Sequence, residues 1–279
     1  MAIDLPQYVD NARPFLKWAG GKSQLLKQYS PYLLNRDRIR HYFEPFLGSG
    51  ALFFHLQPAS AHLADVNDKL VELYQVVQKE VELLIEALTP FRNDEEEFYR
   101  VRSQIAANLS RVERAARLLY LNKTCYNGLY RENKKGEFNV PFGRYHNPAI
   151  CDPQRLRTAS VALHGAELQK ADFEEIVSSA GPGDFVYFDP PYVPLNSTSN
   201  FTTYNRFGFG DEDQRRLSET FDKLSSRDCS VMLSNSNAAF VHELYQGKGY
   251  RLIEIKARRF INSKADGRGL VTELLILNY

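Results

Sequence analysis

An aspartate, two prolines and a tyrosine in succession, Asp189–Tyr192, are the residues of this sequence best suited to chemistry. Asp189 directly follows the wholly apolar segment 185–188 and precedes a proline, which biases its backbone towards an extended conformation and holds its carboxylate rigidly. The Asp189 side chain and the Pro190 carbonyl are then two fixed hydrogen-bond acceptors, beside a Tyr192 ring on which a planar base can stack. Acceptors that grip both hydrogens of a conjugated amine favour a pyramidal nitrogen with an available lone pair. The tetrapeptide thus predicts methyl transfer from a sulfonium to such an amine, through alignment and fixed acceptors, without a metal.

Two glycine-containing loops upstream favour this chemical interpretation over a plain turn that ends a strand. Segment 43–50 contains a Gly-x-Gly between a predicted strand and a predicted helix, where bare backbone lets a ligand approach the carboxyl edge of a sheet. Phe53 stands where a dinucleotide-binding fingerprint has its third glycine, which argues against a pyrophosphate ligand. Asp65 ends the next predicted strand, where a carboxylate can accept hydrogen bonds from both hydroxyls of a ribose. An ordinary turn glycine and a helix cap are the alternative roles.

The other loop, residues 15–22, places two glycines between Trp18 and Lys22. Its bare backbone could wrap the methionine part of a cofactor. A lysine after glycines also suggests a phosphate-binding loop, but the remaining glycine spacing and the preceding strand are missing. Trp18 is the only tryptophan of the chain, and an ordinary core position is the alternative for it.

The elements that would position these residues alternate between strands and helices. Short apolar segments rich in β-branched and aliphatic residues predict strands of a largely parallel sheet that is covered on both faces. The strands are expected at residues 42–46, 62–64, 185–188, 230–233, 251–256 and 273–277, with a helix at 51–56. This order predicts an α/β fold with a Rossmann-like sheet and helices on both faces.

A helical insertion interrupts the strands. Residues 68–121 are rich in Leu, Val, Glu, Lys and Arg at helical spacing, with a break at Pro90. In residues 126–145, three glycines punctuate aromatic and basic side chains, which is typical of a β-hairpin or an ordered loop. We therefore expect a discontinuous catalytic domain, 1–67 with 160–279, and a mainly helical target-recognition subdomain with a β-hairpin, 68–159.

The composition limits the classes of function. Lys and Arg (35) nearly balance Asp and Glu (34), so the net charge of +1 gives no global attraction to a polyanion, and any nucleic-acid site must be a local patch. Two basic clusters are candidates, with a solvated surface as the alternative, and interleaved aromatics favour the first: Arg131, Lys134, Lys135 and Arg144; then Lys256, Arg258, Arg259, Lys264 and Arg268. No apolar run is long enough to cross a bilayer, so we expect a cytoplasmic protein without membrane association. Three widely spaced cysteines fit neither disulfides nor a zinc site.

The combined motifs resemble those of the DNA adenine methyltransferases of the Dam type, which belong to the D12 class and carry an Asp-Pro-Pro-Tyr motif. The resemblance covers nearly the whole chain. It is carried by the segments Phe15–Lys22, Phe43–Gly50, Leu63–Asn67, Tyr126–Leu129, Gly136–Tyr145, Asp189–Tyr192 and Asn200–Thr202. It implies a methyltransferase sheet, S-adenosylmethionine as cofactor, S-adenosylhomocysteine as product, no metal, and double-stranded DNA from which the target adenine is flipped.

The resemblance also implies roles for individual residues. The catalytic positions are Asp189, Pro190, Pro191 and Tyr192. The cofactor-binding positions are Trp18, Ala19, Gly20, Gly21, Lys22, Glu44, Pro45, Phe46, Gly48, Ser49, Gly50, Asp65, Asn67, Asp172, Phe173 and Asp189. The DNA-binding positions are Lys17, Tyr126, Asn127, Leu129, Arg131, Asn133, Pro141 and Arg144.

The expected DNA target follows from four of these positions. In the family, the residues that match Lys17, Leu129, Arg131 and Pro141 read the bases of GATC, and the tyrosine that matches Tyr126 enters the space left in the helix. Lysine and arginine can donate to guanine in the major groove, and leucine and proline can contact the thymine methyl group. GATC is therefore the expected target.

Several alternatives stay open. Tyr130 and Glu132, which flank Arg131, depart from the family pattern and leave the preference for flanking sequence undecided. The same chemistry could act on amines of RNA, protein or a small molecule, although residues 126–145 have no evident use in a small-molecule enzyme. The intact tetrapeptide disfavours an inert DNA-binding module, and the missing third glycine disfavours a nicotinamide dehydrogenase. A companion restriction endonuclease is an expected associate, and methylation of one strand at a time fits a monomer.

Overall fold

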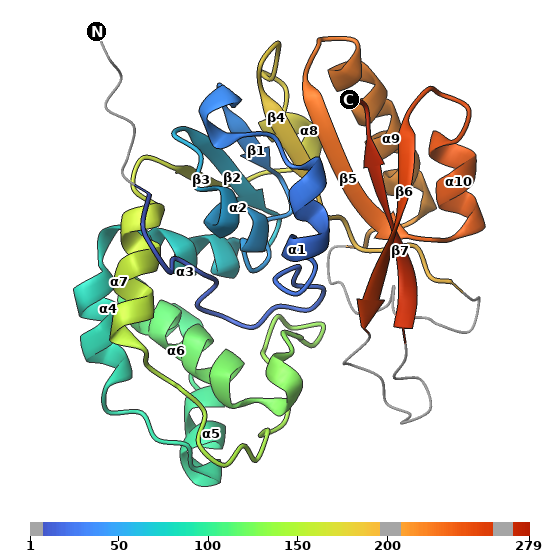
Figure 1. The fold of residues 1–279 in the computed structure, drawn as a ribbon. Helices are drawn as coiled ribbons and strands as arrows, with labels where there is room; N and C mark the ends of the chain where they lie inside the picture. The colour runs from blue at the N-terminus through green and yellow to red at the C-terminus, as the bar shows by residue number, and fades with distance from the viewer. Residues whose placement is uncertain (1–7, 196–207, 259–269) are drawn as a thin grey trace, which may run out of the picture. The chain divides into compact units, whose positions relative to one another are not determined.

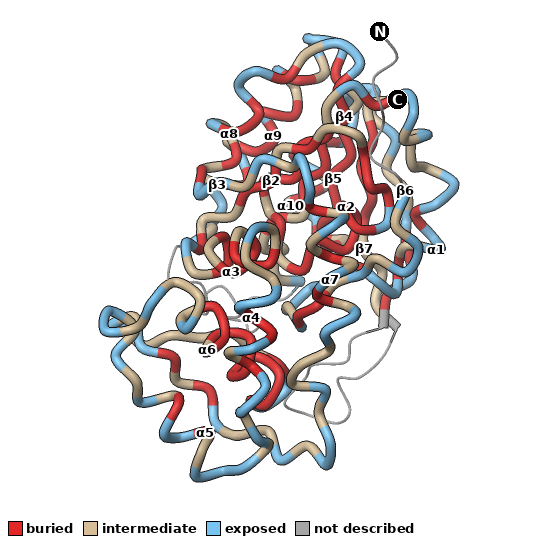
Figure 2. The backbone as a smooth tube through the Cα atoms, turned by 90° about the vertical axis from the view of Figure 1, so that its left-hand side faces the viewer, coloured by how far each residue is buried: buried red, intermediate tan, exposed pale blue. Residues whose placement is uncertain are grey.

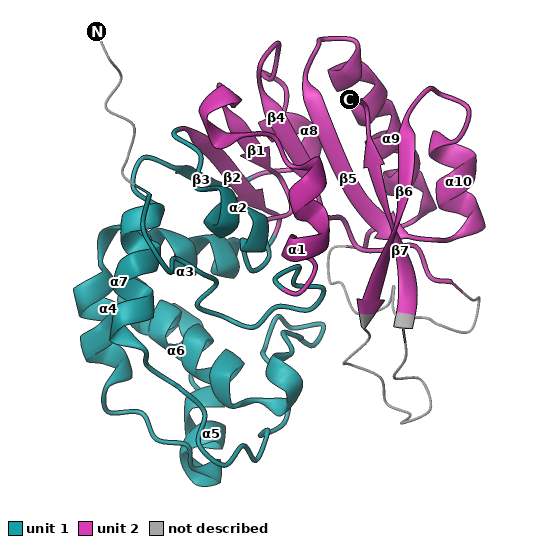
Figure 3. Cartoon of the chain, in the orientation of Figure 1, with its two compact units in different colours: residues 1–23, 48–59, 67–170 teal, residues 24–47, 60–66, 171–279 magenta. Residues whose placement is uncertain are grey.

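The structure is a computed structural model that describes residues 8–195, 208–258 and 270–279. Two compact units make up the chain (Figure 3): unit 1 comprises residues 1–23, 48–59 and 67–170, and unit 2 comprises residues 24–47, 60–66 and 171–279. Parts of two predicted features lie outside the described residues, namely the Asn200–Thr202 motif and Arg259, Lys264 and Arg268 of the second basic cluster.

A seven-stranded sheet in the order β3-β2-β1-β4-β5-β7-β6 is the framework of the fold (Figure 1). Its strands are β1 (Tyr42–Glu44), β2 (Ala61–Asp65), β3 (Glu167–Lys170), β4 (Phe185–Phe188), β5 (Ser230–Ser236), β6 (Arg251–Arg258) and β7 (Leu270–Leu277). Strands β2, β1, β4 and β5 run parallel, whereas β7 pairs antiparallel with both β5 and β6. The predicted α/β, Rossmann-like fold is confirmed. The strand that the sequence analysis missed is β3, because its Glu-Leu-Gln-Lys sequence is largely exposed at the edge of the sheet.

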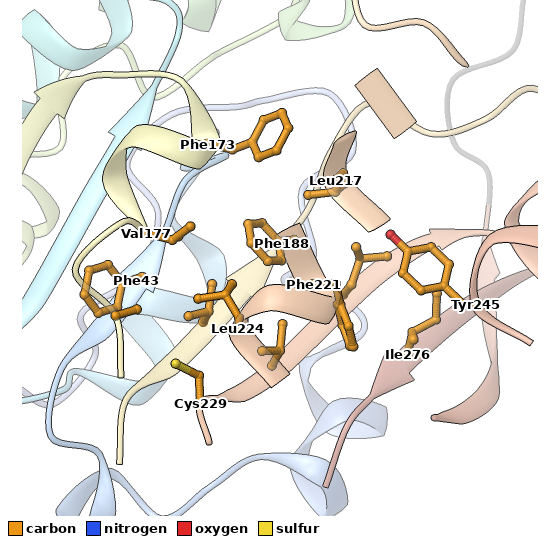
Figure 4. Packing of buried hydrophobic residues seen from close by; sticks show 14 of the residues in the cluster. Phe43, Phe173, Val177, Phe188, Leu217, Phe221, Leu224, Cys229, Tyr245 and Ile276 are labelled. Carbon is orange, nitrogen blue, oxygen red and sulfur yellow. The ribbon is translucent and has the colours of Figure 1, made fainter. Parts of the chain in front are cut away.

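In unit 2, three helices cover one face of the sheet. They are α8 (Phe173–Ile176), α9 (Asp211–Ser225) and α10 (Ala239–Tyr245). Figure 4 shows how Phe173, Phe221 and Tyr245 of these helices pack with Phe188 of β4 and Ile276 of β7 in one hydrophobic core. Strand β4 is buried along its whole length (Figure 2), as expected for an apolar segment in the middle of a parallel sheet.

The opposite face of the same strands is polar at its carboxyl end. Because side chains alternate along a strand, Val186 and Phe188 enter the helix-covered core while Tyr187 points to the other side. The residues that share the side of Tyr187 on neighbouring strands include Glu44, Ser234 and Glu273. An apolar strand therefore ends between a hydrophobic layer and a buried polar layer.

Unit 1 is mainly helical, as predicted for residues 68–121. Its α-helices are α2 (Ala51–Leu56), α3 (Asp68–Lys79), α4 (Val81–Leu88), α5 (Glu95–Arg102), α6 (Arg111–Thr124) and α7 (Pro153–Ala162). The Asn67 side chain accepts hydrogen bonds from the first-turn amides of α3, and Ser110 and Glu113 form a reciprocal capping box on α6. The predicted break at Pro90 falls between α4 and α5. Shorter elements of the chain are α1 (Leu26–Tyr29), η1 (Ser30–Tyr32), η2 (Arg36–Arg38), η3 (Ala106–Asn108) and η4 (Tyr126–Gly128).

Lys123, a buried residue of α6, destabilises unit 1 at neutral pH. Its pKa is lowered to about 8, first by burial and then by the cations of Arg155 and Lys17, which outweigh Asp152. A lysine in the unfolded chain has a pKa of about 10.4. Between this pKa and that of the folded protein, the unfolded chain binds more protons than the folded protein, so stability rises with pH. We expect Lys123→Met to raise the free energy of unfolding by about 2 kcal/mol near neutral pH, and this gain to shrink above about pH 8. Urea unfolding near neutral pH and well above about pH 8 measures the gain in the free energy of unfolding. An equal gain under both conditions would contradict this account.

Candidate active site and recognition hairpin

Strand β4 leads directly into Asp189, and β5 fixes the side chain of that residue. Ser234 Oγ donates a hydrogen bond to Asp189 Oδ1 at 2.9 Å, and the Tyr187 hydroxyl lies 3.1 Å from the same Ser234 Oγ. Both Ser234 and Tyr187 are buried, which strengthens these bonds electrostatically. The carboxylate that the sequence assigns to the reacting amine therefore has a fixed orientation.

The aromatic member of the tetrapeptide is fixed by β7. The Tyr192 hydroxyl donates to Glu273 Oε2 at 2.8 Å. Although the ring is only half-buried, the hydroxyl end is enclosed, and this burial and the charge of Asp189 raise the pKa of Tyr192. Tyr29 of α1 is near the same groups. Burial raises its pKa, and the negative charges of Asp189 and Glu273 raise it further. Tyr192 thus remains a neutral donor, and its ring keeps one orientation.

Two amide side chains hold the backbone that follows Pro190. Gln214 of α9 donates from Nε2 to the Pro191 carbonyl at 2.8 Å, and the Val193 amide donates to Asn235 Oδ1 at 3.1 Å. The two side chains also bind each other, with Asn235 Nδ2 donating to Gln214 Oε1 at 3.0 Å. The course of the chain through the end of the tetrapeptide and just beyond it is therefore set by partly buried hydrogen bonds.

The sequence analysis did not identify these supporting residues. A signal for Ser234 and Asn235 was present, because the polar run 234–236 ends an apolar strand at the same edge of the sheet as the tetrapeptide. Gln214 and Glu273 gave no such signal. They come from a helix and from an antiparallel strand, whose register the sequence does not reveal.

The predicted cofactor residues of unit 2 already contact protein groups. The buried Glu44 accepts a hydrogen bond from the Tyr42 hydroxyl at 2.9 Å. The Phe46 ring stacks on Phe173 with a centroid distance of 5.7 Å and an interplanar angle of 26°. Phe173 is 2% exposed and Phe46 is only partly buried, so Phe46 is the ring of this pair with surface to offer a ligand.

Asp172 has a structural role in unit 2. Its carboxylate accepts from the Glu174 amide at 3.0 Å, which begins α8, and pairs with Arg216 at 2.9 Å. Pro45 directly follows β1, and Asp65 is the last residue of β2. The carboxylate at position 65 thus stands at the strand end at which the sequence analysis placed it.

In unit 1, the two glycine loops pack against each other. Gly48 has a φ of +48°, and a Cβ added to it would lie 3.0 Å from Trp18 Cδ1. A Cβ on Gly21 would lie 3.2 Å from Ser49 Oγ. Trp18 is half-buried and not a core residue. The glycines are therefore required where the loop 17–22, here called the cofactor loop, meets the turn that starts α2.

Among the remaining predicted cofactor residues of unit 1, Lys22 and Asn67 bond to backbone groups, and Gly50 and Ala19 have no such side-chain role. Lys22 is buried and donates from Nζ to the Gly20 carbonyl at 2.5 Å. Gly50 precedes α2 in a left-handed conformation, with a φ of +64°. Asn67 caps α3, as described above. Ala19 lies on the exposed side of the cofactor loop.

Residues 126–145, here called the recognition hairpin, fold back on themselves as predicted. Antiparallel bridges join Cys125 to Phe142 and Glu132 to Phe138. At the tip, the Asn133 amide donates to the Glu137 carbonyl at 2.9 Å. The hairpin carries every predicted DNA-binding residue except Lys17: Tyr126, Asn127, Leu129, Arg131, Asn133, Pro141 and Arg144.

The hairpin orients several of these side chains. Arg131 Nε donates to Asn139 Oδ1 on the opposite arm at 2.7 Å, which fixes the guanidinium. Tyr126 is 51% exposed, and the Arg144 side chain is 79% exposed and 3.8 Å from the Glu95 carboxylate. An anchored arginine and an exposed ring on the same hairpin suit contact with a large polar ligand.

Lys17 joins the hairpin despite its distance in the sequence. The Asn122 side chain accepts from the Lys17 amide at 2.9 Å and donates to the Lys17 carbonyl at 2.7 Å. The Lys17 ammonium lies 3.9 Å from the centre of the Tyr145 ring. Unit 1 therefore contains all eight residues to which the family resemblance assigns DNA binding.

The sequence is similar to a known family and to several characterised proteins. The D12 class N6 adenine-specific DNA methyltransferase family matches residues 18–261. The type II methyltransferase M.MjaIII of Methanocaldococcus jannaschii is 44% identical over 96% of this chain and 99% of its own length. The type II methyltransferase M1.LlaDCHI of Lactococcus lactis subsp. cremoris is 44% identical over 96% of each chain. The DNA adenine methylase of Escherichia coli (strain K12) is 36% identical over 95% of each chain.

The seven-stranded sheet is that of a Rossmann-like α/β fold, and the family whose model matches the chain consists of methyltransferases that act on an amine of adenine. The family match covers most of the chain, and the relatives match over nearly their full lengths. The chain belongs to the D12 class N6 adenine-specific DNA methyltransferase family. It is an adenine-specific DNA methyltransferase, and its family implies S-adenosylmethionine as the methyl donor.

The described part of the chain also bears on membranes, metals and thiols. Within the described ranges, no helix has the length and apolar character needed to span a membrane. The same ranges contain no group of three His, Cys, Asp or Glu side chains placed to hold a metal ion. Cys125 and Cys229 are buried free thiols, and burial raises their pKa values to about 12 and about 11.

Proposed function

We propose that this enzyme methylates the N6 amine of a flipped adenine in GATC sites of double-stranded DNA. The observation that carries the proposal is the pair of fixed groups after β4, Asp189 held by Ser234 and Tyr192 held by Glu273. An acceptor of fixed direction and a ring of fixed plane are what a flipped aminopurine requires.

The proposed catalysis rests on alignment. Asp189 and the Pro190 carbonyl accept the two N6 hydrogens, and Tyr192 stacks on the base, so the nitrogen lone pair faces the methyl donor. Ser234 prevents the carboxylate from turning away. The Asp189 oxygen also stabilises the positive charge that develops on N6 as the new N–C bond forms, and one of the two N6 protons then leaves along its hydrogen bond to Asp189 and passes to solvent. S-adenosylmethionine, when bound, supplies a methyl group on a sulfonium whose thioether is an excellent leaving group.

The residues present fit this cofactor. A sulfonium is attracted by carboxylates, and Glu44 and Asp189 both act on Tyr42, whose pKa is raised by burial and then by their charges. The bare backbone of Gly48 lets the Trp18 indole pack against the turn that starts α2, which keeps the two predicted cofactor segments of unit 1 together. We assign cofactor binding to the sixteen positions predicted from the sequence, with S-adenosylhomocysteine as product and no metal.

Target reading is assigned to Lys17, Leu129, Arg131 and Pro141. The bond to Asn139 supports this for Arg131, because a guanidinium that is already ordered loses less entropy when it binds guanine. Tyr126 is proposed to fill the gap left by the flipped base, which its exposure permits. The other predicted DNA contacts, including Arg144, would position the phosphates.

The biological setting is also proposed. Residues 68–159 would form the target-recognition subdomain of a cytoplasmic, monomeric enzyme, and the remainder its catalytic domain. A companion restriction endonuclease would cleave the same site when it is unmethylated, without a lasting complex between the two proteins.

The proposal predicts which DNA is methylated. With methyl-labelled S-adenosylmethionine, a GATC duplex should acquire N6-methyladenine, and one changed base pair should lower the rate about 10- to 100-fold. Nucleoside analysis identifies the labelled base. Equal label in both duplexes would refute GATC as the target site, and label in cytosine would refute adenine as the methylated base. Label in no DNA would refute DNA methylation as the activity.

A further inference from the structure

A pair of stacked rings joins the cofactor loop to the recognition hairpin inside unit 1. Trp18 and Tyr130 lie with their ring centroids 5.3 Å apart and their planes 25° from parallel. Trp18 is a proposed cofactor residue, and Tyr130 directly precedes Arg131, a proposed base-reading residue. Within unit 1, a single ring contact thus connects the proposed cofactor loop to the proposed DNA-reading hairpin.

Tyr130 is anchored at its other end. Its hydroxyl donates to the Glu132 carboxylate, which also accepts a hydrogen bond from Lys69 in the first turn of α3. Lys69 Nζ additionally donates to the Gly136 carbonyl at 2.9 Å. The Glu132 side chain is 6% exposed, so these charge-assisted bonds act in a medium of low dielectric constant. Burial and the bond to Glu132 raise the pKa of Tyr130, which keeps its hydroxyl a donor.

The backbone of the cofactor loop is held separately. Asn122 binds both the amide and the carbonyl of Lys17 and donates to the Gly128 carbonyl at 3.1 Å. A Cβ on Gly128 would lie 2.5 Å from Lys17 Cδ, so the contact is tight. These bonds fix the chain next to Trp18, whereas the plane of the indole is set by the Tyr130 ring and by the edge contact with Gly48.

We propose that Tyr130 is a positioning residue that orients Trp18 for the cofactor and makes cofactor affinity depend on whether the hairpin holds DNA. This inference rests on the proposed function of the hairpin. DNA that holds the hairpin in this conformation also favours the stacked orientation of Trp18, so the two ligands bind cooperatively without touching. Linkage requires that each changes the affinity of the other by the same factor.

The test uses the fluorescence of Trp18, the only tryptophan of the chain. S-adenosylhomocysteine is titrated into the full chain with and without a saturating duplex of the sequence that the enzyme methylates. In the unchanged protein, the duplex should tighten binding about tenfold. In Tyr130→Leu, binding without DNA should weaken about fivefold or more, and the effect of the duplex should fall to about one. Tyr130→Phe should keep most of the affinity and lose part of the coupling, because its ring stacks without the bond to Glu132.

Tyr99→Leu is the matched control. It makes the same change on α5 of the same unit, where the ring contacts Arg102. It should change neither the affinity for S-adenosylhomocysteine nor the effect of the duplex on that affinity. The proposal is overturned if Tyr130→Leu binds S-adenosylhomocysteine as tightly as the unchanged protein, or if the duplex still tightens that binding fully. If Tyr130→Leu does not fold, a full effect of the duplex in Tyr130→Phe overturns the proposal instead. Normal binding of S-adenosylhomocysteine with methylation of no DNA refutes the proposed function instead, and the titration without DNA still decides whether Tyr130 orients Trp18.

Discussion

Asp189→Asn is expected to lower the rate of methyl transfer about 10³-fold, while affinities for DNA and S-adenosylhomocysteine change less than about threefold. The substitution keeps the shape of the side chain and can keep the bond from Ser234. It replaces one acceptor oxygen by an amide nitrogen, whose hydrogens oppose those of the substrate amine. Single-turnover transfer of labelled methyl groups, with enzyme in excess, measures the chemical step directly.

The control for this prediction lies at the other end of β4. Asp184 is buried, and although burial alone would raise its pKa, hydrogen bonds from Arg40 and the Gly181 amide hold that pKa below its ordinary value. Asp184→Asn should lower stability and leave the single-turnover rate within about twofold. Ser234→Ala, which removes the hydroxyl that supports Asp189 and also bonds to Tyr187, should lower the rate about tenfold. Turnover of Asp189→Asn above about a tenth of the original rate would remove Asp189 from its role.

Arg131→Ala is expected to relax the choice of target. Loss of a bidentate contact to guanine costs about 1–3 kcal/mol at that base pair, so the ratio of rates on GATC and on a duplex changed at the guanine should fall about 10- to 100-fold. The comparison is made with kcat/KM on both duplexes, because a general loss of DNA affinity cancels in the ratio.

Lys134→Ala distinguishes base reading from phosphate binding. Lys134 is exposed near the tip of the same hairpin. Its loss should weaken binding to both duplexes alike and reduce the salt dependence, leaving the ratio unchanged. If Arg131→Ala also left the ratio unchanged, Arg131 would be a phosphate contact and the source of specificity would lie elsewhere.

The parts of the fold that sequence analysis predicted are those set by local pattern. The short apolar run of β4, preceded by glycines, favoured a buried strand, and the stop imposed by the prolines after Asp189 placed the tetrapeptide at its end. Strand β3 escaped because it buries little apolar surface. The limits of the helices in unit 1 were accessible in part, since the capping box at Ser110 and Glu113 is a local signal.

The supports of the site were less accessible because they depend on register between distant segments. Glu273 reaches Tyr192 only because β7 runs antiparallel beside β5. In the same way, Lys69 and Glu132 are separated by 62 intervening residues and meet only when α3 and the hairpin are folded together. The sequence analysis noted Glu132 as an unusual acid beside Arg131, and the contacts with Tyr130 and Lys69 explain its presence.

The way in which the recognition hairpin is tied down limits how it can be exchanged. Lys69 holds Glu132 and Gly136 from outside the hairpin, and Asn122 holds Gly128 together with Lys17. A hairpin grafted from another protein would leave Lys69 without its buried acid and the indole of Trp18 without its neighbour, unless those positions were exchanged as well. New target preferences are therefore more readily engineered, or evolved, by substituting the outward side chains of this hairpin one at a time than by transplanting it whole.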